Sequence, residues 1–66
     1  MFNIEPVNQD KTRFDLINSV SGNTWGEIKY NNLLQKFTYE QIVTEVSQSQ
    51  LEFTLKELKE LNEDLT

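Results

Sequence analysis

The sequence predicts an α+β fold: a three-stranded antiparallel β-meander with one face covered by two C-terminal α-helices. Two observations predict this class. Residues 2–30 carry β-branched and aromatic side chains at nearly alternating positions, interrupted by turn-forming residues. Residues 38–66, the predicted helical half, carry two helix-start signals and apolar residues at helical spacing. At 66 residues the chain, 1–66, is expected to be a single small domain with one thin core.

The central hairpin is expected to join segments 12–18 and 24–30 through the turn formers Ser21-Gly22-Asn23. A two-residue loop would mix polar and apolar side chains on both faces of the sheet, whereas a three-residue loop pairs like with like. A slip by one residue turns the core face outward, so polarity decides between the two registers. We therefore predict the three-residue loop.

This register places Phe14 opposite Tyr30 and Leu16 opposite Ile28. The same polarity rule, applied to the segment before residue 12, places Ile4 opposite Phe14 and adds residues 2–6 as a third strand. We expect this strand at the edge of the sheet, because Pro6 has no N–H to donate to a neighbouring strand. The expected core face of the sheet is then made of six side chains: Phe2, Ile4, Phe14, Leu16, Ile28 and Tyr30.

The two expected helices, 39–47 and 54–65, begin with the same signal. A threonine, Thr38 or Thr54, stands at each N-cap, and a Gln or Glu follows three residues later, which makes a capping box. The longer helix is expected to face the core with a stripe of leucines: Leu51, Leu55, Leu58, Leu61 and Leu65.

Segment 50–53 is ambiguous between a fourth strand and a first turn of the last helix with Ser49 as its cap. On a continuous helix, Phe53 would lie roughly opposite Leu51 and Leu55 at about 100° per residue. This angle favours a break before Thr54. A coiled coil is an alternative use of the leucines, since Leu51, Leu55, Leu58, Asn62 and Leu65 fit two heptads with a polar residue at one core position.

Composition excludes most catalytic chemistry. The chain has no Cys and no His, and it lacks a Gly-rich phosphate loop, so we predict no catalytic residues, no cofactor and no metal site. The acidic residues of the last helix are interpreted as a solvated face. No apolar stretch of about 18 residues and no leader pattern are present, which predicts a cytoplasmic protein without membrane contact.

Residues 38–65 resemble a DNA-binding helix-turn-helix, in which a Thr-capped helix precedes a second one. The resemblance implies DNA binding, but the turn lacks the usual Gly and the second helix is acidic. A net charge of −5 opposes contact with phosphates. The alternative function is therefore a nucleic-acid-linked regulator, either a degenerate helix-turn-helix or an acidic mimic of nucleic acid that inhibits a DNA-binding protein.

By elimination, we predict a non-catalytic protein-interaction module or small regulatory subunit, with a homodimer as one arrangement. Trp25 is expected on the sheet face away from the core, where an exposed Trp would be an interface anchor. The candidate contact residues are Trp25, Ile17, Glu27 and Lys29 on that face, and Glu57, Glu60 and Asp64 on the outer helix face.

Overall fold

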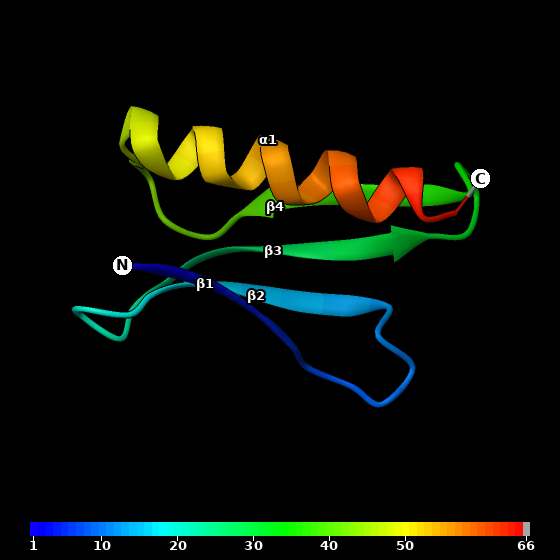
Figure 1. The fold of residues 1–66 in the computed structure, drawn as a ribbon, viewed down its shortest axis with the longest axis horizontal. Coiled ribbons are helices and arrows are strands. Elements are labelled where there is room, and N and C mark those ends of the chain that lie inside the picture. The colour runs from blue at the N-terminus through cyan, green and yellow to red at the C-terminus, as the bar shows by residue number, and fades with distance from the viewer. Residues whose placement is uncertain (66) are drawn as a thin grey trace.

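The computed structural model describes residues 1–65, which form an antiparallel sheet of four strands and one α-helix (Figure 1). The strands follow one another in chain order across the sheet. The α+β class with an antiparallel sheet is confirmed, but a fourth strand replaces the first of the two predicted helices. The predicted helical half, 38–66, reaches one residue beyond the described part. The elements are β1 (Phe2–Pro6), β2 (Arg13–Asn18), β3 (Thr24–Asn31), β4 (Lys36–Gln41) and α1 (Gln48–Glu63).

Strand β4 overturns the predicted helix at 39–47. Phe37 lies opposite Tyr30 and Tyr39 lies opposite Ile28, both on the core face, whereas Thr38 and Glu40 lie on the other face. The segment therefore has a period of two rather than 3.6. The predicted helix was rich in β-branched and aromatic residues, which favour strands, and its nine residues are too few for a stable helix without extensive packing. The spacing of Thr38 and Gln41 imitates a capping box without being one.

The turn between β3 and β4 is held by a side chain. The Asn31 Oδ1 atom accepts hydrogen bonds from the backbone N–H groups of Leu33, at 2.9 Å, and Leu34, at 3.0 Å. Gln35 then adopts the left-handed backbone conformation, with φ of 55°. Asn is suited to position 31 because its short side-chain amide can accept from the backbone N–H groups two and three residues later. The hairpin therefore closes tightly with its two leucines at the tip.

The register differs from the prediction by two residues. Phe14 lies opposite Ile28 instead of Tyr30, and Leu16 lies opposite Gly26 instead of Ile28. Ile4 likewise lies opposite Leu16 rather than Phe14. A shift of two keeps every side chain on its face, so alternating polarity cannot detect it. The predicted core face is accordingly correct even though its cross-strand pairs are not.

A β-bulge changes the position of Trp25. Leu16 pairs with Gly26 but Ile17 pairs with Thr24, so Trp25 is an extra residue in β3. Such a bulge re-aims a side chain, and Trp25 is turned into the core, where it is 2% exposed. Its ring makes edge contacts with Phe2 and with Phe53 of α1. The prediction that Trp25 lies on the outer face of the sheet is wrong.

Helix α1 starts earlier than predicted. Its N-cap is Ser47, whose Oγ accepts from the Gln50 backbone N–H while the Gln50 side chain accepts from the Ser47 N–H. Segment 50–53 is therefore helical, which settles the ambiguity against a strand and against Ser49 as cap. Thr54 lies inside the helix and is not a cap.

The helix is also rotated relative to the predicted leucine stripe. Phe53, Leu58 and Leu61 pack against the core, whereas Leu51 is 40% and Leu55 is 64% exposed. Asn62 also contacts the sheet, through a hydrogen bond with Phe37. Because Leu58 and Asn62 are used within the chain, the five residues of the two predicted heptads do not form one exposed face for a coiled coil. The buried core consists of Phe14, Leu16, Trp25, Ile28 and Phe37.

Thr54 connects the helix to the sheet. Its Oγ1 accepts a hydrogen bond from Trp25 Nε1 at 3.1 Å and donates one to the Gln50 carbonyl at 2.8 Å. Thr54→Val keeps the volume but leaves the buried indole N–H without a partner. We expect the free energy of unfolding to fall by about 1–3 kcal/mol, measured by urea titration. Thr44→Val, at an exposed loop position, is the matched control; an equal change in both variants would contradict this role.

The capping box gives a second prediction. Ser47→Ala removes the acceptor for the Gln50 N–H and should lower the free energy of unfolding by about 0.5–2 kcal/mol. Ser49→Ala, two residues further on the exposed side, should change stability far less. Thermal or urea unfolding of the two alanine variants compares them directly, and identical midpoints would place the cap elsewhere.

Candidate functional site

The face of the sheet that α1 does not cover is polar. Because core residues alternate with their neighbours along each strand, the residues between them point to the opposite face. This open face carries charged side chains on all four strands: Glu5, Arg13, Asp15, Glu27, Lys29, Lys36 and Glu40. Ile17, half-buried, lies on the same face beside Asn3 of β1.

Glu27 is the centre of an ion-pair network on the open face. Although charged, the residue is only 6% exposed. Its Oε2 lies 3.1 Å from Arg13 Nη2, and its Oε1 lies 3.0 Å from Lys29 Nζ. Lys29 Nζ is also 3.2 Å from Glu40 Oε2. Both carboxylate oxygens of Glu27 are thus paired, as a buried carboxylate requires.

The network keeps Glu27 ionised. The hydrogen bond from Lys29 lowers the pKa of Glu27, burial opposes this effect, and Arg13 adds to the lowering. The same contact with Glu27, followed by that with Glu40, raises the pKa of Lys29. A carboxylate with a lowered pKa and a lysine with a raised one are poorly matched to proton transfer near neutral pH. The network therefore has the character of a structural ion-pair cluster.

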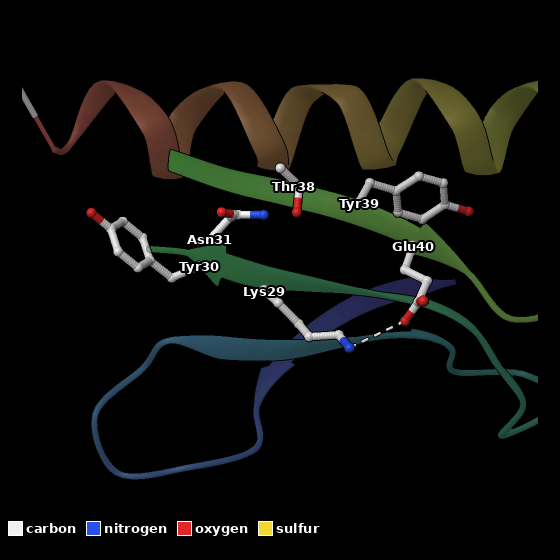
Figure 2. A pocket seen from close by; sticks show the side chains of 6 residues that line it. All are labelled: Lys29, Tyr30, Asn31, Thr38, Tyr39 and Glu40. Carbon is white, nitrogen blue, oxygen red and sulfur yellow. Dashed lines mark ion pairs between the residues drawn. The ribbon is translucent and has the colours of Figure 1, made fainter. Parts of the chain in front are cut away.

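A surface hollow of about 340 Å³ lies between β3 and β4. Figure 2 shows Lys29 reaching toward Glu40 across it, while Tyr30 and Tyr39 point to opposite ends. The Tyr39 hydroxyl is buried without a hydrogen-bond partner among residues 1–65, and burial raises its pKa, so it stays protonated. The side chains that line the hollow can make polar contacts with a bound molecule, but no nucleophile among them contacts a base. It is lined by Lys29, Tyr30, Asn31, Thr38, Tyr39 and Glu40.

The acidic residues of α1 are remote from the open face, because the helix covers the other side of the sheet. Glu57 is half-buried, and burial, aided by the neighbouring Glu60 carboxylate, raises the pKa of Glu57. Glu60 and Asp64 are exposed. Within residues 1–65, no three His, Cys, Asp or Glu side chains are grouped as metal ligands would be.

The structure thus divides the predicted contact residues into three places. Ile17, Glu27 and Lys29 share the open face, the three acids lie on the helix, and Trp25 is in the core between the two layers. Sequence reasoning missed Arg13 and Glu40 as partners in the network. It also missed the hairpin tip.

The tip carries the most exposed leucine of the described chain. Leu33 is 95% exposed and Leu34 is 58% exposed. The residues 31–35 lie between two strands of alternating pattern and begin with two asparagines, which is a turn signal. That signal was present in the sequence, but it was obscured because the following segment, 39–47, was assigned to a helix.

Comparisons with protein-family models, with curated proteins and with solved structures found no match for this chain. Among residues 1–65, no helix has the length and apolar character needed to cross a membrane. A helix-turn-helix is also not formed, since 38–65 contains the end of β4 followed by one helix.

The Glu27 network predicts a pH dependence of stability. The pKa of Glu27 in the folded protein is below its ordinary value of 4.5, so its contribution is complete above pH 4.5 and is lost as pH falls through the folded pKa. Glu27→Gln should lower the free energy of unfolding at neutral pH by about 1–3 kcal/mol and reduce its loss in acid.

Glu40→Gln is the matched control, because the Glu40 side chain is 64% exposed and, within residues 1–65, its ion pair is with Lys29 alone. We expect it to leave the acid dependence close to that of the parent chain. Urea titrations at a series of pH values measure both variants. If the free energy of unfolding fell equally with decreasing pH in the parent chain and in Glu27→Gln, the assigned role of Glu27 would be contradicted.

Proposed function

We propose that this protein is a non-catalytic protein-interaction module that contacts its partner through the tip of the β3–β4 hairpin. The observation that carries the proposal is the display of Leu33 and Leu34 on a hydrogen-bonded turn. Leucines exposed on a flexible tail would have to be ordered on binding. Here the Asn31 side chain already holds the backbone of both leucines, so less backbone entropy is lost on binding and more of the binding free energy is retained.

The surroundings of the tip match the composition of small interfaces. Such interfaces combine a few apolar anchors with a polar rim that remains partly solvated. Asn31 both holds the turn and lines the hollow, so the leucines adjoin the polar surface containing Lys29 and Glu40. Burying one leucine contributes about 1.5–3 kcal/mol, so two leucines are enough to anchor a weak or regulated contact.

The ion-pair network supports this contact without forming its anchor. Glu27 is paired and buried, and it keeps Lys29 next to Glu40 at the border of the hollow. Of the residues predicted to make the contact, Lys29 is the one we retain at the rim. Trp25 is not retained, because a side chain that is 2% exposed offers no surface to a partner.

The double variant Leu33→Ser/Leu34→Ser tests the proposal. We expect capture of the partner from native lysate to fall at least about tenfold, since the apolar anchors are lost. Both side chains are exposed, so the free energy of unfolding should change by less than about 0.5 kcal/mol for each substitution.

Val20→Ser is the matched control, since Val20 is an apolar residue, 86% exposed, in the β2–β3 loop. It should capture the partner as the parent chain does. Quantitative pull-down of the two variants, with cross-linking to identify the captured protein, compares the two surfaces. Equal capture by the double variant and the control would remove the hairpin tip from the contact.

A further inference from the structure

The outer edge of β4 is a second surface with unused binding capacity. The Tyr30 N–H donates to the Thr12 carbonyl at 2.7 Å, so the hydrogen-bonding groups of Tyr30 point toward β2. Its partner in β4, Phe37, must then point its own N–H and C=O away from β3. Alternate residues behave alike, so the backbone groups of Tyr39 and Gln41 also point outward from the sheet.

Asn62 shows what this edge can bind. Its side-chain Oδ1 accepts from the Phe37 N–H at 2.7 Å, and its Nδ2 donates to the Phe37 carbonyl at 3.2 Å. The carboxamide therefore makes the two bonds that a peptide group of a neighbouring strand would make. It closes one end of the edge. Within residues 1–65, no comparable clamp covers Tyr39 and Gln41.

Helix α1 presents exposed apolar side chains beside this open part of the edge. At about 100° per residue, Leu51, Leu55 and Asn62 lie on one flank of α1. Asn62 contacts β4, so the whole flank overhangs β4, and Figure 1 shows the helix running alongside that strand. Leu51 is 40% and Leu55 is 64% exposed on it. A strand added to β4 would have apolar side chains next to it.

The opposite edge, β1, lacks these features. Pro6 has no N–H to donate, which is a common protection of edge strands. The helix flank on that side begins with Phe53, which contacts Phe2, and continues with the acidic Glu57 and Glu60. Two copies meeting at β1 would bring these carboxylates together. The edge of β4 is therefore the one suited to self-association.

We propose that a second copy of this chain binds at the β4 edge. In an antiparallel arrangement about a two-fold axis, Tyr39 of each copy pairs with Gln41 of the other, and the two sheets become one continuous sheet. The helices then lie side by side on the same face and run antiparallel. Leu51 and Leu55 of one copy cover those of the other.

The flank is complementary to itself in this arrangement. A two-fold contact brings the same patch of both copies together, so each patch must tolerate its own image. The leucines meet leucines. At about 100° per residue, Glu52 and Lys59 lie on the same border of this flank, so the antiparallel order brings Glu52 of one helix toward Lys59 of the other. The Glu40 side chains approach each other on the open face, where each already pairs with Lys29. This surface is distinct from the tip at Leu33 and Leu34.

Sedimentation of the purified chain over a range of concentrations tests the proposal. The parent chain should shift reversibly from the monomer mass toward twice that mass. Leu55→Lys should raise the dissociation constant of the dimer at least about tenfold, since one apolar contact per copy is replaced by two like charges. Val20→Lys also replaces an exposed aliphatic side chain by lysine, but at a site away from β4, and this variant should dimerise as the parent chain does.

Amide hydrogen exchange locates the contact. The N–H groups of Tyr39 and Gln41 should become protected as concentration rises, whereas those of Phe2 and Ile4 on the β1 edge should not. A chain that stays monomeric at all concentrations, with Tyr39 and Gln41 exchanging freely, would overturn the proposal and leave the edge to a strand of another protein. A dimer that Leu55→Lys does not weaken, or that protects β1 instead, would overturn it too.

Discussion

The contact between Trp25 and Thr54 determines how the helix sits on the sheet. The indole donates to Thr54 Oγ1 and packs by its edge against Phe53, so two consecutive residues of α1 must face inward. This sets the rotation of the helix about its axis. Leu51 and Leu55 are thereby turned toward the rim at β4 although their hydrophobicity alone would place them in the core. The surface available to other molecules is thus a consequence of burying one indole.

Apart from Trp25, alternation along the strands was enough to predict which residues of β1, β2 and β3 face the core, but not how the strands pair. The pattern repeats every two residues, so a shift by two leaves polarity unchanged. Capping signals were less reliable, because Thr38-x-x-Gln41 fits a helix start as well as Ser47-x-x-Gln50 does. The two segments differ in what they can pair with. Phe37 and its neighbours can form hydrogen bonds with the edge of β3, and this pairing stabilises a strand more than a short helix would be stabilised.

Trp25 was misplaced because strict alternation has no means of representing a bulge. The signal was nevertheless present at Gly26, an isolated glycine within a strand pattern. A Cβ there would lie 2.6 Å from Tyr39 Cε1 and 2.9 Å from the Glu40 carbonyl, so β4 can approach only if residue 26 has no side chain. Glu27 and Lys29 were placed on the correct face, but Arg13 and Glu40 could be recognised as their partners only once the register and β4 were known.

The distribution of charge separates the surfaces that can bind by apolar contact from those that cannot. Within the ion-pair network of the open face, Arg13 and Lys29 balance Glu27 and Glu40, so these four residues together contribute nothing to the net charge of −5. The acidic excess lies elsewhere, including the β1 side of α1 with Glu57 and Glu60. The hairpin tip and the β4 edge are next to the balanced surface. A partner approaching either of them meets leucines and neutralised ion pairs, so apolar contact and backbone pairing, rather than long-range attraction, decide whether it stays bound.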